Sequence, residues 1–180
     1  GFFSFEAEKR GASRVVGFDE WSSPFVDRPA GFDTVHRLLN SRVEFHRLDL
    51  QTLDPAQLGQ FDIVLCLGVL YHLENLPACM RRLRSLLVED GVVYVETQMS
   101  QVKSPLPLFE YASDIYPTVA IQDKKNLALT GISNQLFPNE PAVMNLAHSY
   151  DFECRSLSGP HNRYTFENPY RQFFKLTKRG

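Results

Sequence analysis

An apolar run without alternation lies near the middle of the chain, between Gln60 and Leu73. Polar turns bound it on both sides, and a run of this kind is typical of a parallel strand that is buried on both faces of its sheet. In such sheets, ligands bind just beyond the carboxyl ends of the strands. Here that end carries Gly68, followed by two hydrogen-bonding side chains, Tyr71 and His72. We therefore expect the functional site at this end of the strand.

The pattern before this run predicts helices and strands in alternation. They are helix 1–10, strand 14–19, helix 32–40 and strand 43–49. Gly11 is placed to end the first helix. Residues 20–31 hold Trp21, two prolines and a glycine, which indicates a loop. Both predicted strands end in a carboxylate, Asp19 and Asp49.

The alternation continues after the run. The expected elements are helix 75–89, strand 92–97, helix 139–150, strand 152–157 and strand 173–177. Asn75 and Asn139 are candidate helix caps, each with a proline in the following turn. This order predicts an α/β fold with a Rossmann-like, doubly wound and mostly parallel sheet. The last two strands are joined without a helix, which indicates an antiparallel edge.

We expect one domain over residues 1–180, because this length is ordinary for a single core. Residues 98–137 are long and rich in proline and aromatic side chains. Long connections are usually functional, so this segment is interpreted as a lid or substrate segment with a short helix over residues 108–113.

Composition narrows the function classes. No apolar run approaches the roughly 20 residues of a membrane span, and residues 1–6 lack the features of a signal peptide. The net charge of −2 gives no general attraction to nucleic acid. The three scattered cysteines are interpreted as buried free thiols of a cytoplasmic protein. Their spacing predicts no metal site.

The two strand-end carboxylates suggest a ligand. An acid at this position suits a ribose diol, because one carboxylate can accept hydrogen bonds from both hydroxyls. Either acid could instead cap a turn. Asp19 and Asp49 together, at matching strand ends in front of Gly68, favour an adenosine ligand.

At this point several segments resemble class I S-adenosylmethionine-dependent methyltransferases. Residues 1–12 resemble the tail of motif I, Asp19 matches the acid of motif II, and residues 61–73 match motif IV. Asp49 and Leu50 match the position whose acid and backbone hold the adenine.

The sequence of residues 67–72, Leu-Gly-Val-Leu-Tyr-His, resembles that of one branch of the family. This branch contains the tRNA wobble-uridine carboxymethyl- and methyltransferases. Residues 137–141, followed by the strand start at Asp151, resemble the same branch.

The resemblance implies S-adenosylmethionine as the cofactor. The residues that it implies for the cofactor are Gly1, Phe2, Asp19, Asp49, Leu50, Leu67, Gly68 and Val69, with Trp21 either stacked on the adenine or covering the sheet. In the family order 3-2-1-4-5-7-6, the first strand would precede Gly1. This sequence is therefore expected to lack that strand, to leave two strand edges open, and to form a homodimer or borrow a strand that covers the gap.

Methyl transfer requires orientation of the acceptor and, for many acceptors, a base. His72 is the candidate base, with a role in holding the loop as the alternative, and Tyr71 is the second candidate catalytic residue. Glu96, Tyr111 and Arg171 are candidate substrate residues, and Glu96 could instead cap its loop. Some members of the resembled branch use a carboxymethyl donor, which implies a cation facing the added carboxylate, and Arg171 lies near that position.

The predicted function is methyl transfer from S-adenosylmethionine to a small molecule or a nucleoside. One alternative is a tRNA wobble-uridine modifying enzyme. The other is a truncated, non-catalytic relative of the methyltransferase fold.

Overall fold

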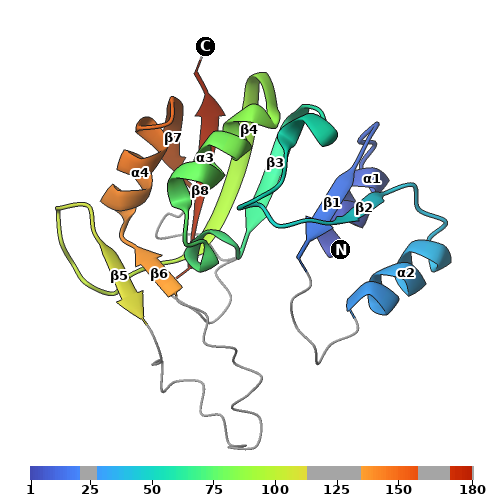
Figure 1. Cartoon of the computed structure of the whole chain (residues 1–180), viewed down its shortest axis with the longest axis horizontal. Coiled ribbons are helices and arrows are strands. Elements are labelled where there is room, and N and C mark those ends of the chain that lie inside the picture. The colour runs from blue at the N-terminus through green and yellow to red at the C-terminus, as the bar shows by residue number, and fades with distance from the viewer. Residues whose placement is uncertain (21–27, 113–134, 158–170, 180) are drawn as a thin grey trace, which may run out of the picture. The chain divides into compact units, whose positions relative to one another are not determined.

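A computed structural model describes residues 1–20, 28–112, 135–157 and 171–179 of the chain (Figure 1). The chain divides into two compact units, residues 1–53 and residues 54–180. Among the described residues, no helix has the length and apolar character that crossing a membrane requires.

The first unit contains two helices and a parallel pair of strands. Its elements are α1 (Phe2–Lys9), β1 (Val16–Asp19), α2 (Arg28–Leu38) and β2 (Glu44–Arg47). Val16 lies opposite Glu44, and Asp19 lies opposite Arg47. The helix predicted from residue 32 begins at Arg28, because Pro29 is tolerated in a first helical turn. The interpretation of residues 28–31 as loop was therefore wrong.

An aromatic cluster joins the helices of this unit to its strands. The ring centroid of Phe32 lies 5.2 Å from that of Phe5 and 4.3 Å from that of Phe45. His36, one turn after Phe32, lies 5.7 Å from the same ring. A Cβ atom on Gly17 would lie 3.1 Å from the Phe45 ring. Because glycine has no side chain, this ring can pack directly against the backbone of β1.

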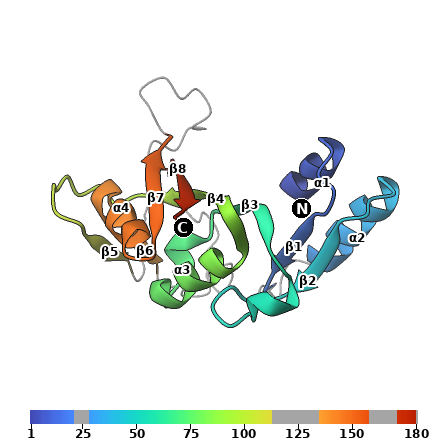
Figure 2. The same ribbon diagram turned by 90° about the horizontal axis from the view of Figure 1, so that it is seen from above.

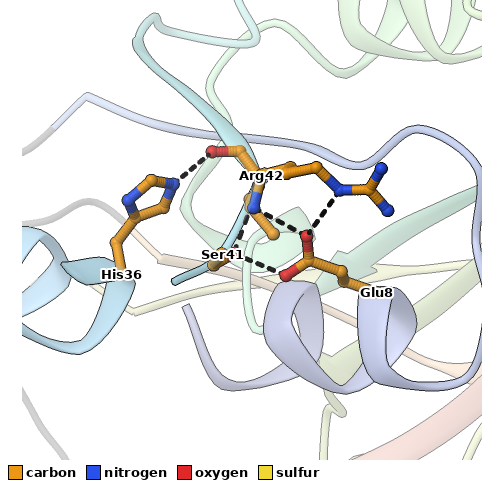
Figure 3. A network of polar contacts seen from close by, with 5 residues as sticks. Glu8, His36, Ser41 and Arg42 are labelled. Carbon is orange, nitrogen blue, oxygen red and sulfur yellow. Dashed lines mark hydrogen bonds and ion pairs between the residues drawn. The ribbon is translucent and has the colours of Figure 1, made fainter. Parts of the chain in front are cut away.

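A polar network joins the end of α1 to the turn before β2 (Figure 3). The carboxylate of Glu8 accepts hydrogen bonds from the Ser41 hydroxyl and from the backbone N–H of Arg42, both at 2.6 Å. These two bonds hold the pKa of Glu8 below its usual value. His36 Nε2 lies 3.0 Å from the carbonyl oxygen of Val43 in the same turn. The network fixes the path from α2 into β2.

The second unit is built on a four-stranded sheet. Its order is β3 (Phe61–Leu67), β4 (Leu87–Gln98), β8 (Arg171–Lys178) and β7 (Phe152–Ser156). β3 and β4 are parallel, as expected, while β8 is antiparallel to both β4 and β7. Helices α3 (Leu76–Ser85) and α4 (Glu140–His148) lie on the same side of this sheet (Figures 1 and 2).

The core of this unit lies under the two helices. Alternate residues of the strands point into it and are fully buried, including Val93, Val95, Phe152, Phe174 and Leu176. α3 adds apolar side chains at helical spacing, among them Met80 and Leu83. Both predicted helix caps are confirmed: the side chains of Asn75 and Asn139 accept hydrogen bonds from the backbone N–H groups of Ala78 and Ala142, each at 3.0 Å.

The expectation that the central apolar strand is buried on both faces was wrong. β3 lies at the end of its sheet and pairs only with β4 among the described strands. Ile63 and Leu65 point to the face without α3 and α4, and their side chains are 57% and 45% exposed. Cys66, on the opposite face, is 3% exposed. β1 likewise pairs with one strand, β2, among the strands that the structure describes.

The segment after β4 also differs from its prediction. Residues 109–112 form a strand, β5 (Phe109–Ala112), instead of a short helix. It pairs antiparallel with β6 (Gln135–Pro138), and a partner this distant in sequence leaves no local signal. The aromatic residues Phe109 and Tyr111 favour an extended backbone once that partner is present.

One asparagine side chain anchors this segment. The Oδ1 atom of Asn139 accepts a second hydrogen bond from the backbone N–H of Leu108, at 3.1 Å. Its Nδ2 atom donates to the carbonyl oxygens of Ser104 and Leu106, at 3.2 and 2.8 Å. The side chain that caps α4 therefore also holds the backbone that leads into β5.

Candidate functional site

The candidate site of the second unit lies at the carboxyl ends of β3 and β4, where β8 begins. Two short connections leave these ends, one of which contains the 3₁₀ turn η2 (Leu70–His72). The structure brings together Gly68, Tyr71, Glu96 and Arg171, which we call the Arg171 cluster. All four are residues that the sequence proposes for the site.

An ion pair forms the centre of the Arg171 cluster. Nε of Arg171 donates to Oε1 of Glu96, and Nη2 donates to Oε2 of the same carboxylate at 3.0 Å. The Glu96 side chain is about a tenth exposed and that of Arg171 about a third. Hydrogen bonding to Glu96 raises the pKa of Arg171, against the opposing effect of its partial burial. The guanidinium therefore stays charged and bound through two parallel hydrogen bonds.

The register of β4 and β8 explains how these two side chains meet. Glu96 lies opposite Phe173, and Arg171 lies two residues before Phe173 on the same face of the strand. Diagonal neighbours of this kind are within reach of a long side chain. Seventy-five positions separate the two residues, so no sequence spacing predicts the pair.

Tyr71 packs under the guanidinium group of Arg171. The Arg171 Cζ atom lies 5.5 Å from the centre of the Tyr71 ring, within the range of a cation–π contact. Nη2 of Arg171 also lies 3.3 Å from the Tyr71 hydroxyl oxygen and donates to it. Phe137 of β6 lies on another side of the ring, with 6.1 Å between centroids. Contacts to the ring and a hydrogen bond to the hydroxyl oxygen therefore both fix the position of the Tyr71 side chain.

Gly68 gives the guanidinium room at the end of β3. Its φ of +72° lies in the left-handed region that favours glycine. A Cβ atom at this position would lie 3.3 Å from Nη2 of Arg171 and 3.7 Å from Oε2 of Glu96. The Gly68 N–H donates to the carbonyl oxygen of Glu96 at 2.9 Å, so β3 and β4 remain paired up to the cluster.

His72 is exposed and follows Tyr71 in η2, with 4.1 Å between the centres of the two rings. Its backbone N–H donates to the carbonyl oxygen of Val69 at 2.9 Å. Leu67 and Val69, on either side of Gly68, are half-buried. Tyr111, on β5, is 58% exposed.

The first unit places its predicted residues at two strand ends. Asp19 ends β1, and its carbonyl oxygen accepts from the backbone N–H of Leu48 at 3.2 Å. Asp49 follows β2, and its Oδ1 accepts from the backbone N–H of Gln51 at 2.8 Å. This bond is the turn-capping contact that the sequence left open as the alternative role of Asp49. Leu50 is buried.

The remaining predicted residues lie at the start of α1 or beyond the described residues. The carbonyl oxygen of Gly1 accepts from the backbone N–H groups of Ser4 and Phe5, and Phe2 is 70% exposed. Trp21 lies outside the described residues.

The three cysteines are free and buried. Burial raises the pKa of the Cys66 thiol to about 12, so this side chain is a protonated core residue at neutral pH. Within the part of the chain that the structure describes, no group of three acidic, histidine or cysteine side chains could hold a metal ion.

Replacing Gly68 with alanine tests the tight approach of Arg171 to the strand end. We expect Gly68→Ala to lower the free energy of unfolding by about 1–2 kcal/mol, because alanine is strained at positive φ. Urea denaturation measures the change. Gly31→Ala is the control, since a Cβ atom at Gly31 of α2 would meet no atom within 4 Å. A Gly68→Ala protein as stable as the wild type would contradict the expectation.

Comparison with known proteins identifies relatives of the chain. Over residues 1–93 it matches the family model described as a methyltransferase domain. It is 29% identical over 131 residues to a tRNA U34 carboxymethyltransferase of Campylobacter fetus. A tRNA U34 carboxymethyltransferase of Campylobacter hominis is 31% identical over 126 residues. These matches cover 70% and 66% of the chain and 45% and 42% of the relatives, so the chain spans less than half of their length.

Solved structures show the same fold. The N-terminal domain of EvdMO1, with SAH bound, has a TM-score of 0.65 at 18% identity, covering 98% of this chain and 68% of that one. An S-adenosylmethionine-dependent methyltransferase from Mesorhizobium loti has a TM-score of 0.64 at 16% identity, covering 99% and 86%. The family match spans more than half of the 180 residues. The chain therefore belongs to the methyltransferase domain family and has the α/β fold of the S-adenosylmethionine-dependent methyltransferases.

Proposed function

We propose that the chain is an S-adenosylmethionine-dependent methyltransferase domain that acts on a small-molecule or nucleoside acceptor. The observation that carries this proposal is the family match over residues 1–93, which includes Asp19, Asp49 and Gly68. The fold supports it, since a solved structure of similar fold contains S-adenosylhomocysteine, the product that remains after the cofactor has lost its methyl group.

The residues proposed for the cofactor are those that match the motifs of the family. The Asp19 carboxylate would accept hydrogen bonds from the ribose hydroxyls, and Asp49 and Leu50 would hold the adenine. Gly1 and Phe2, at the start of α1, are proposed for the methionine portion. The backbone at Leu67, Gly68 and Val69 would line the cofactor by its shape. These roles suit the residue types, because carboxylates accept from diols and glycine permits close approach of a ligand.

The proposed reaction is an in-line displacement at the methyl carbon of the cofactor. When bound, S-adenosylmethionine would supply the methyl group: an oxygen or nitrogen atom of the acceptor would form a bond to this carbon as the carbon–sulfur bond breaks, and S-adenosylhomocysteine would leave with the electron pair. The acceptor would lose its proton to a base. His72 is the proposed base, and its position on an exposed turn beside Tyr71 supports this role. The main task of the protein is to orient the two reactants.

Calorimetry with S-adenosylhomocysteine tests the proposed cofactor site. We expect the chain to bind this ligand and Asp19→Asn to bind it roughly tenfold more weakly, because an amide accepts poorly from two hydroxyls. Asp33→Asn is the matched control, since Asp33 is an exposed acid of α2 in the same unit. Failure of the wild-type chain to bind would support a non-catalytic relative of the fold.

The proposed base can be tested through the pH dependence of turnover. A base must be unprotonated to accept the proton of the acceptor, so the wild-type rate is expected to rise with pH on the acidic side of its profile. His72→Ala should remove this rise and lower the rate by roughly a hundredfold. A His72→Ala enzyme with an unchanged pH profile would reject the role and leave His72 as a residue of the loop.

The relatives favour a second candidate function, modification of the wobble uridine of tRNA. Carboxymethyl transfer would require a donor with an additional carboxylate, and Arg171 is the cation of the candidate site. Binding to tRNA that weakens steeply as salt concentration rises would support this function, since phosphate contacts release counterions. Binding of free uridine without binding of tRNA would favour a nucleoside acceptor.

We also propose that the working protein is a cytoplasmic homodimer. Among the strands that the structure describes, β1 and β3 each pair with one other strand, and Ile63 and Leu65 of β3 are exposed. These observations support a second copy as the covering partner. Light scattering after size exclusion should give twice the chain mass of 20.6 kDa. A single species at the chain mass would reject the dimer.

A further inference from the structure

The hydrogen-bond donors of Arg171 are partly used within its own cluster. A guanidinium carries five N–H donors in a fixed plane. Nε gives one to Glu96, and Nη2 gives one to Glu96 and one to the Tyr71 hydroxyl oxygen. The carboxylate thus sets the plane and position of the group that contacts the phenol.

This arrangement determines the role of the Tyr71 hydroxyl. A phenol can donate one hydrogen bond through its proton and accept through its oxygen. Arg171 donates to the oxygen, and an arginine has no acceptor to offer in return. The phenol proton is therefore not used by Arg171 and is available to another acceptor. At the end of β3, where the proposed function locates the ligands, an oxygen atom of a bound molecule can accept it.

Glu96 affects this hydroxyl indirectly, through its hydrogen bonds to Arg171. Its carboxylate is buried at the end of β4, and a buried charge is costly unless it is paired. The pairing constrains Arg171 in turn, because the same Nη2 atom serves both Glu96 and Tyr71. A neutral amide at position 96 would keep the size of the side chain and lose the charge that fixes the guanidinium.

We propose that Glu96 is a positioning residue that holds Arg171 so that Tyr71 donates its hydroxyl proton to an oxygen atom of the bound ligand. This inference rests on the proposed function. The ligand oxygen belongs either to the cofactor or to the acceptor, since an oxygen atom of either one can accept this hydrogen bond. Glu96 itself does not touch the ligand.

The first arm of the test measures the position of Arg171 without any ligand. Phenylglyoxal modifies arginine side chains, and peptide mass spectrometry reports the rate at Arg171. We expect Glu96→Gln to raise this rate roughly tenfold, because the charged hydrogen bonds are lost. Glu89→Gln is the matched control, since Glu89 lies on the same strand and pairs with Lys178 at 3.7 Å. Circular dichroism and thermal unfolding confirm that each variant is folded.

The second arm measures ligand binding in a double-mutant cycle of Glu96→Gln and Tyr71→Phe. S-adenosylhomocysteine probes the cofactor, and uridine added to its complex probes a nucleoside acceptor. We expect Glu96→Gln to weaken one of the two roughly tenfold and to have no further effect in the Tyr71→Phe background. The probe that weakens identifies the ligand that receives the hydrogen bond.

The two arms separate failure of this inference from failure of the proposed function. Wild-type binding of S-adenosylhomocysteine with equal losses from Glu96→Gln in both backgrounds, or with no loss for either probe, overturns the inference alone. A wild-type chain that binds neither probe overturns the proposed function and, with it, the ligand part of the inference. In every case, unchanged phenylglyoxal labelling of Arg171 in Glu96→Gln rejects the positioning role.

Discussion

The ion pair between Glu96 and Arg171 determines the shape of the candidate site. It joins β4 to β8 at the end of the sheet where β3 and β4 also finish, so one contact relates three strands. A carboxylate with this little exposure would be costly to bury alone, and the pairing removes most of that cost. Pairs of this kind contribute little net stability and more to the choice of one arrangement. The glycine at the end of β3 and the aromatic ring under the guanidinium complete the same arrangement.

The sequence predicts best what depends on neighbouring residues. Alternating strands and helices, and the two asparagine caps, follow from local backbone preferences and were confirmed. The prediction that β3 is buried on both faces was wrong, because an apolar run does not reveal which elements pack against the strand. The strand over residues 109–112 was mistaken for a helix because its partner begins at residue 135.

The same distinction applies to the site. Gly68, Tyr71 and His72 were named from one continuous motif, which in the structure contains the turn η2 after β3. Glu96 and Arg171 were each named as substrate residues, but their pairing depends on the register of two strands that are far apart in the chain. That register is fixed by packing of the whole sheet. A single sequence therefore identifies the residues of the site more readily than their contacts.

The Asn139 side chain caps α4 and accepts from or donates to three other backbone groups of residues 104–108. These four hydrogen bonds require one acceptor oxygen and a nitrogen with two donors at the end of a short side chain. Asparagine is the only amino acid whose side chain has both groups at this distance from the backbone. Every amino acid that one nucleotide change can put in its place loses at least one of these bonds. Aspartate keeps the shape but would face two carbonyl oxygens without a proton to give. A substitution at this position is therefore expected to weaken both the start of α4 and the backbone path of residues 104–108, although the residue lies outside the chemistry of the site.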